Sequence, residues 1–440
     1  VGPRSCVADT GRQKILNNYH EVIIIFIPFL AYNQINQTSL QHYQNLCSEK
    51  FAGRGYVNEG IYHAQNYILQ HFKDSLGLQP ILDNYLFTQN FTHPVNTFPF
   101  NIELTVKGKK LIAGEDFIVH PGSNSFEAKR KVYYLDTLNF KTKTELTKIL
   151  SKLPKKTILV CKSGVTNNKT LYKEIIQYYQ QNLSNHCVVF LHTKKLTWGV
   201  LPLQFKNCFL DVLEDKFNVT AIQIQIKVQA KFIQDFSVNN IIAATNKISP
   251  NDSCIVICAH YDHLGKMGQN TTFYGANDNA SGVVMMLDLA NKFKNTQTKY
   301  PIVFIAFAGE ELGLLGSKFF VDNLPKVFNV KLVLNLDMVS AGENGLTVAN
   351  ANNNNGFFEI INDINFQKNF LPVIVAKNGS ANSDHFSFHE AGYPAIFIYA
   401  LGNYKHYHDI HDKFENLNLK FYPKTLNLLS DFILKINGGN

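Results

Sequence analysis

Three apolar runs in the middle of the chain each end next to side chains that can bind a metal ion. The runs are Ile255–Ala259, Ile302–Ala308 and Leu332–Leu336, and their β-branched and apolar residues are typical of buried parallel strands. The carboxyl ends of such strands meet at one edge of a sheet, where ligands bind. We therefore expect one imidazole and several carboxylates to lie close together there. In chain order, the polar residues that follow the runs are His260, Glu310, Glu311 and Asp337.

A further carboxylate, Asp278, lies between the first two runs in the sequence GANDNASG, just before a predicted helix, Ser281–Phe293. Histidine nitrogen and carboxylate oxygen are ligands that zinc takes in proteins. A single catalytic zinc ion needs three protein ligands, and this stretch offers more acid than one ion requires. A carboxylate on a central loop can bridge two ions about 3.5–4 Å apart, and Asp278 is best placed to do so. The alternative is that these residues cap helices or face water.

The order of the motifs in this region resembles that of the co-catalytic zinc exopeptidases. This group includes the bacterial leucyl aminopeptidases, the glutamate carboxypeptidases and, more distantly, the glutaminyl cyclases. The resemblance implies a three-layer αβα, phosphorylase/hydrolase-like domain with a mostly parallel central sheet. The motifs that carry it, between Asn239 and Leu417, are HYDHLG, GANDNASG, GEELGLLGS, NLDM, SDHFSF, GYPAIFI and YHDIHD.

The resemblance also implies two zinc ions per chain and a set of protein ligands. It assigns His260 and Glu311 to one ion, and Asp337 and His408 to the other. Asp278 would bridge the two ions. All five residues are present in the expected motifs.

Four more residues receive roles beside the ligands. Two adjacent acids point in different directions, so one can bind metal while the other faces a metal-bound water. The resemblance implies that Glu310 is the general base and Glu311 the ligand. Tyr407 is expected to donate a hydrogen bond to the developing oxyanion, unless it is an aromatic residue packed at the rim. Asp262 and Asp412 are expected to accept the second N–H of the two ligand histidines. For Asp412 the alternative is an acid at a helix N-terminus.

The composition is that of a globular protein. The chain has 440 residues, of which 45% are hydrophobic and 17% charged. The formal net charge of +8 is spread over scattered lysines without a nucleic-acid-binding motif, so we expect no nucleic-acid partner. The seven cysteines include no C-x-x-C pair, and nothing in them demands a disulfide framework.

An apolar segment near the start of the chain, Val22–Tyr32, is too short to span a bilayer and follows the basic residues Arg12 and Lys14. This pattern is typical of a secretory signal. It predicts a leader over residues 1–36 and an exported, periplasmic or extracellular protein. A buried strand or helix is the alternative. Because there is no second apolar span, we expect no stable membrane insertion.

The rest of the chain divides into a catalytic domain and an insertion. We expect residues 37–95 and 232–440 to form the catalytic domain, and residues 96–231 to form a β-rich insert that weakly resembles a protease-associated domain. No cluster of metal-binding residues occurs in the insert, so its role is structural or limits substrate size. The turn that contains Arg54 is interpreted as a plain connection between two helices.

These features predict a zinc-dependent exopeptidase acting on peptides, and they favour an aminopeptidase. A carboxypeptidase needs a cation, usually arginine, to hold the terminal carboxylate. No arginine occurs between Cys254 and Asp412, although Arg130 of the insert stays a candidate. The alternatives are a glutaminyl-peptide cyclotransferase with one zinc ion, a carboxypeptidase or dipeptidase, and a binding domain that has lost its chemistry.

Overall fold

The computed structural model describes residues 35–81, 87–248, 252–323, 329–379 and 381–438. The segment Val22–Tyr32 lies outside the described residues, and the prediction of a secretory signal stays a prediction. Among the residues described, no helix has the length and apolar character needed to cross a membrane.

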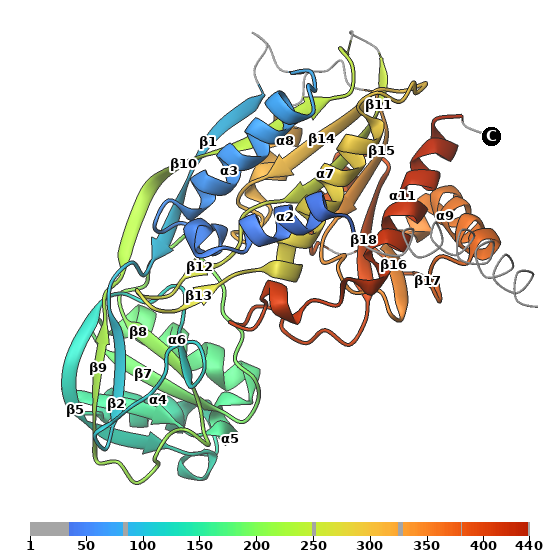
Figure 1. Cartoon of the computed structure of the whole chain (residues 1–440). Coiled ribbons are helices and arrows are strands. Elements are labelled where there is room, and N and C mark those ends of the chain that lie inside the picture. Colours follow the sequence, from blue (N-terminus) through green and yellow to red (C-terminus); the bar gives the residue numbers. More distant parts are fainter. Residues whose placement is uncertain (1–34, 82–86, 249–251, 324–328, 380, 439–440) are drawn as a thin grey trace, which may run out of the picture.

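The first sheet has eight strands, with a parallel centre and both parallel and antiparallel pairs towards its edges (Figure 1). The strands β14, β11, β15 and β18 are all parallel to their neighbours within this group. All three predicted core strands belong to it. In sheet order the strands are β1 (Thr88–Thr97), β10 (Lys231–Ala244), β14 (Ile302–Phe307), β11 (Ser253–His260), β15 (Asn329–Leu336), β18 (Ala395–Leu401), β16 (Gly345–Ala349) and β17 (Ile374–Ala376).

Helices cover both faces of this sheet, because its central strands are apolar on both sides. On β11, Ile255 and Ile257 pack in the core that contains the residues of α7, whereas Val256 and Cys258 pack in a second core with residues of α8 and α10. This arrangement confirms the predicted three-layer α/β fold. The helices are α2 (Gln37–Leu46), α3 (Gly60–Gln70), α7 (Ser281–Phe293), α8 (Leu315–Asp322), α9 (Asn355–Lys368), α10 (His385–Glu390) and α11 (Tyr422–Ile436).

A second eight-stranded sheet forms a separate lobe, drawn in cyan and green in Figure 1, and we call residues 102–228 the second lobe. The lobe is connected to the first sheet through β1 and β10, which pair antiparallel as far as Thr97 and Lys231. In sheet order its strands are β3 (Lys109–Lys110), β2 (Ile102–Val106), β9 (Gln223–Val228), β5 (Phe126–Leu135), β6 (Thr157–Cys161), β7 (Cys187–His192), β8 (Cys208–Leu213) and β4 (Phe117–Val119).

The second lobe also contains helices. They are α4 (Lys143–Lys152), the short α5 (Ser163–Thr166) and α6 (Lys169–Asn182). The strands β5 to β8 run parallel, which requires crossover connections of this kind. The exact division of the chain into domains at residues 96 and 231 stays a prediction.

Arg54 links the N-terminal helices to the loops that carry the candidate site. Its side chain is fully buried, and it ends a short helical turn, Glu49–Arg54. A guanidinium group has five N–H donors, and here it donates five hydrogen bonds to backbone carbonyl groups. The acceptors are the carbonyl oxygens of Leu46 (3.0 Å), Tyr261 (3.0 Å), Tyr274 (2.8 Å), Gly275 (2.6 Å) and Asp278 (3.3 Å).

The turn that contains Arg54 is therefore more than a plain connection between two helices. Three of its acceptors belong to the segment Tyr274–Asp278, which has no regular hydrogen-bonding partner strand at that point. A buried carbonyl without a donor costs free energy, so the guanidinium stabilises the path of this segment.

We predict that Arg54→Met lowers the thermal stability of the protein strongly. Removal of the guanidinium leaves five buried carbonyl groups without their donor, at a cost of about 3 kcal/mol or more. The matched control is Arg130→Met, because Arg130 lies over the ring of Phe126 with its carbon Cζ 4.9 Å from the centroid. The control should cost about 1 kcal/mol or less. Thermal unfolding followed by circular dichroism measures both, and equal shifts would contradict the role of Arg54.

Candidate metal centre

The structure brings all five predicted metal ligands to one rim of the first sheet. Four of them end or follow the parallel central strands, and the fifth precedes a helix that packs on these strands. All are buried or nearly so, and the most exposed side chain, that of His408, is 14% exposed. The five are His260 at the end of β11, Asp278 before α7, Glu311 after β14, Asp337 after β15 and His408 after β18.

One group of ligand atoms surrounds His260. Its Nε2 atom lies 3.4 Å from Oδ1 of Asp278 and 3.5 Å from Oδ1 of Asp337. Both Nε2 of His260 and Oδ1 of Asp337 are buried and have no hydrogen-bond partner. The three side chains are close enough together to hold a metal ion. Unpaired buried polar atoms are costly in a protein, and a bound cation removes that cost.

A second group surrounds His408. Its Nε2 atom lies 3.1 Å from Oδ2 of Asp278 and 3.2 Å from Oε2 of Glu311. Asp278 therefore turns one oxygen towards each histidine. A carboxylate in this position can be shared by two cations.

These distances favour a pairing of the candidate ligands that differs from the expected one. Instead of His260 with Glu311 and Asp337 with His408, the short distances favour His260 with Asp337 and Glu311 with His408. His260 also lies in a group with Glu310 and Glu311 that is close enough to hold a metal ion, so the pairing stays a proposal. The first pair follows from the sheet, because His260 and Asp337 end neighbouring parallel strands. The second pair depends on the path of the loop after β18, which no local sequence pattern specifies.

The electrostatics of the rim favour positive charge. Burial lowers the pKa of the His408 imidazole, but the charge of Glu311 and the hydrogen bonds to Asp278 and Glu311 outweigh burial and raise this pKa to about 11. For His260 burial also lowers the pKa, and the charge of Glu310 helps to raise it well above its ordinary value. The carboxylates thus create an environment that stabilises a cation at either histidine.

Asp262 contacts the first group through its backbone carbonyl and through its carboxylate. The Nδ1 atom of His260 lies 3.1 Å from the backbone carbonyl oxygen of Asp262, which can only accept. The carboxylate of Asp262 instead accepts hydrogen bonds from the backbone N–H groups of Glu310 (3.2 Å) and Glu311 (3.3 Å) and from the hydroxyl of Tyr56 (3.1 Å). The carbonyl thus makes the shorter contact with His260, and Oδ1 of the carboxylate lies 3.7 Å from the same Nδ1 atom. The carboxylate also fixes the turn that carries the two glutamates.

Asp412 does not orient the His408 ring, and this part of the expectation is wrong. Its carboxylate accepts hydrogen bonds from the backbone N–H groups of Asn277 (2.7 Å) and Asp278 (3.0 Å) and from the hydroxyl of Tyr404 (2.6 Å). Asp412 thus holds the Asp278 loop from the side opposite Arg54.

Tyr407 stacks on His408, with ring centroids 3.8 Å apart and an angle of 15° between the planes. Its side chain is half exposed, at 50%. Burial and the nearby carboxylates raise its pKa, so the phenol keeps its proton and can donate a hydrogen bond. The predicted contact with an oxyanion stays a prediction.

Two further side chains contact the candidate ligands and had received no role. The Nδ1 atom of His263 lies 2.7 Å from Oε1 of Glu311, which leaves Oε2 facing His408. The hydroxyl of Ser383 donates to Oδ2 of Asp337 at 2.9 Å. Both residues belong to motifs noted in the sequence, HYDHLG and SDHFSF, so the signal was present without an assignment.

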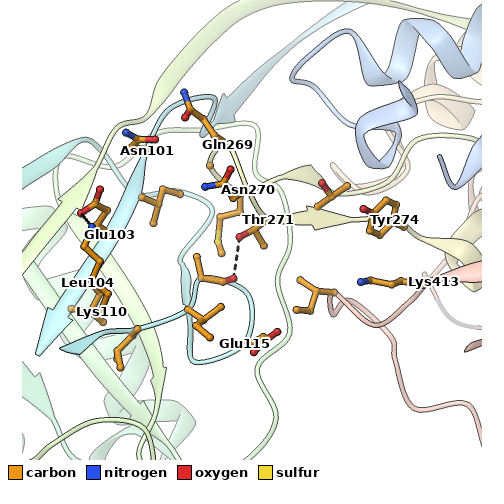
Figure 2. Close-up of a pocket in the computed structure, with 18 residues that line it drawn as sticks. Asn101, Glu103, Leu104, Lys110, Glu115, Gln269, Asn270, Thr271, Tyr274 and Lys413 are labelled. Atoms are coloured by element: carbon orange, nitrogen blue, oxygen red, sulfur yellow. Dashed lines mark hydrogen bonds and ion pairs between the residues drawn. The ribbon is translucent and has the colours of Figure 1, made fainter. Parts of the chain in front are cut away.

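A cavity of about 460 Å³ lies where the second lobe meets the first, next to the loop of His408 (Figure 2). Glu103 and Lys110 of the second lobe line one side, and Tyr274 and Lys413 line the other. Ile410, two residues after His408, also lines it. None of the five candidate ligands does, so this cavity is a neighbour of the metal centre and no part of it.

Comparisons with known proteins agree on one family. Residues 240–433 match the model of peptidase family M28. A probable leucine aminopeptidase of Arthroderma otae is 33% identical over 184 residues, which cover 38% of this chain and 48% of the relative. Aminopeptidase YwaD of Bacillus subtilis is 35% identical over 144 residues, covering 31% of this chain and 30% of the relative. The matched part thus spans less than half the length of these relatives.

Solved structures show the same fold over most of the chain. BSAP, a zinc aminopeptidase from Bacillus subtilis, superposes with a TM-score of 0.65 and 21% identity, covering 90% of this chain and 94% of that one. An aminopeptidase from Aneurinibacillus sp. strain AM-1 gives a TM-score of 0.61 at 20% identity, with 90% and 93% covered. The matched residues 240–433 include all five candidate ligands. The segment that carries the candidate ligands is thus similar to peptidase family M28.

Proposed function

We propose that the protein is a zinc-dependent aminopeptidase that removes the N-terminal residue from peptides. The observation that carries the proposal is the position of Asp278, whose two carboxylate oxygens face two separate groups, one around His260 and one around His408. The names of relatives support the same activity, since two of them are aminopeptidases.

The residues present fit a pair of zinc ions. The donor set consists of imidazole nitrogen and carboxylate oxygen, which suit zinc. We assign His260 and Asp337 to one ion, Glu311 and His408 to the other, and Asp278 to both. When bound, such a pair lowers the pKa of a water molecule and polarises the scissile carbonyl. Both histidines carry the Nδ1 proton, because each donates to a backbone carbonyl, and so both leave Nε2 free for metal.

Glu310 is the proposed general base. Its Oε2 atom lies 3.9 Å from Nε2 of His260, at the edge of the ligand group. Burial raises the pKa of this carboxyl well above its ordinary value, which makes its anion a better proton acceptor. The Asp262 carboxylate fixes the Glu310 backbone. Glu310 would take a proton from the attacking water and pass it to the leaving amine.

The arginines support aminopeptidase over carboxypeptidase action. The guanidinium of Arg54 donates five hydrogen bonds to backbone carbonyl groups and so has no N–H left for a substrate. Arg130 lies on β5, which Figure 1 shows in the second lobe, away from the ends of β11 and β15. Of the arginines that the structure describes, neither is placed to hold a terminal carboxylate. The proposed pair of ions provides one position for the scissile carbonyl and one for a free amine. This arrangement favours cleavage at the N-terminus of a peptide.

We predict that Glu310→Gln and Glu311→Gln have different consequences. Glu310→Gln should keep both zinc ions and lose about 10²–10⁴-fold in turnover, because only the general base is removed. Glu311→Gln should lose zinc, because it removes a ligand. The control is Glu390→Gln at an exposed position at the end of α10, which should change neither. Metal content per chain and kcat measure the outcome, and equal zinc loss in the two variants would show that the roles are wrongly assigned.

We also predict that acetylation of the substrate's amino group abolishes hydrolysis. Matched peptides with free and acetylated N-termini, and with free and amidated C-termini, test the polarity directly. Amidation should leave kcat/KM nearly unchanged, because Arg54 has its donors occupied and Arg130 lies in the second lobe, away from the rim. The reverse pattern would assign the protein to the carboxypeptidases. Cyclisation of an N-terminal glutamine with one zinc ion per chain would instead identify a cyclotransferase.

A further inference from the structure

The second lobe contacts the loop that carries His408, and we call residues 405–410 the His408 loop. The backbone N–H of Trp198 donates to the carbonyl oxygen of His408 at 3.0 Å. In return, Nδ1 of His408 lies 2.9 Å from the carbonyl oxygen of Trp198, 210 residues away in the sequence. The two residues thus form a reciprocal pair of hydrogen bonds.

Lys195 makes three more contacts with the same loop. Its ammonium group lies 2.6 Å from Oδ2 of Asp409 and 3.1 Å from the carbonyl oxygen of Tyr407. It also donates to the carbonyl oxygen of Lys405. The loop is therefore held by both the charge and the backbone of one short segment, Lys195–Trp198.

Trp198 is itself firmly anchored. It is 4% exposed, and its indole N–H donates to the carbonyl oxygen of Val119 at 2.8 Å. Its ring stacks on Phe273 of the other lobe, with centroids 4.7 Å apart. A carbonyl fixed in this way offers a fixed acceptor to His408.

The backbone of His408 needs such support. Its φ of +55° lies in the left-handed region, which residues with a side chain rarely adopt without compensation from their surroundings. The bonds to Trp198 on both the carbonyl and the ring of His408 supply that compensation.

We infer that Lys195 and Trp198 are positioning residues for the metal centre. The Trp198 carbonyl selects the His408 tautomer with its proton on Nδ1, so that Nε2 faces Asp278 and Glu311, and Lys195 holds the loop in register. This inference rests on the proposed function, in which His408 is a zinc ligand. The second lobe contributes no ligand side chain to the groups described, yet it completes the site through a backbone carbonyl and an ammonium group.

The test measures zinc binding by the full chain in competition with a chromophoric chelator. Lys195→Met should lower the affinity for one of the two zinc ions by about 10-fold or more, because the loss of groups that orient a ligand has an effect of this size. Lys194→Met, at the exposed neighbouring lysine, is the matched control and should bind as the unmodified protein does. Lys195→Arg keeps the charge and should restore most of the affinity. Trp198 is the only tryptophan, so an unchanged emission spectrum shows that the segment remains folded.

Two outcomes would overturn the inference. If Lys195→Met and Lys194→Met bind zinc alike, Lys195 does not position the site. If Lys195→Arg is as weak as Lys195→Met, the charge is not the cause. His408→Ala separates this failure from that of the proposed function, because it should lose one zinc ion. If His408→Ala keeps both ions at full affinity, the ligand assignment itself is wrong.

Discussion

The site depends on how the carboxylate of Asp278 is held between two histidines. Its backbone is fixed from two sides, by the buried guanidinium of Arg54 at its carbonyl and by the carboxylate of Asp412 at its N–H. Both contacts come from residues more than 130 positions away in the chain, at separations of 224 and 134. A buried carboxylate can face two cations only if its position is fixed before they bind, since a mobile one would turn both oxygens towards a single ion.

The same principle explains the side chains around Asp278. Both ligand histidines donate Nδ1–H to a backbone carbonyl, one of Asp262 and one of Trp198. Backbone acceptors cannot lose their function by protonation, so each imidazole keeps one tautomer at every pH at which it is neutral. Carboxylates instead hold the backbone in place, since that of Asp262 accepts hydrogen bonds from the backbone N–H groups of the two adjacent glutamates. The nearest acceptor of each Nδ1–H is therefore a neutral backbone carbonyl, and for His260 the Asp262 carboxylate lies farther away, at 3.7 Å.

Much of this could be predicted from the sequence, because the information is local. The core strands and α7 follow from apolar runs, and the rim residues follow from the position of each polar side chain at a strand end. The pairing of Glu311 with His408 could not be predicted, nor could the contact of His408 with Trp198, because both depend on the path of the loop after β18. The role of Arg54 could not be predicted either, since four of its five acceptors are more than 200 residues away in the chain and become its neighbours only when the first lobe has folded.

The charges of the rim also explain why so many acids are tolerated in one place. Burial raises the pKa of Glu310 and Asp337, whereas contact with the histidines lowers the pKa of Asp278 despite its burial. Without other cations, the acids would have to share protons, and the histidines would take them up, as the pKa of about 11 for His408 indicates. Two divalent cations would supply the same positive charge without occupying the nitrogen lone pairs with protons, and would leave Glu310, at the edge, available to accept a proton. The cluster of buried acids and histidines at the rim therefore accounts both for its attraction to cations and for the proposed roles of Glu311 as a ligand and Glu310 as a base.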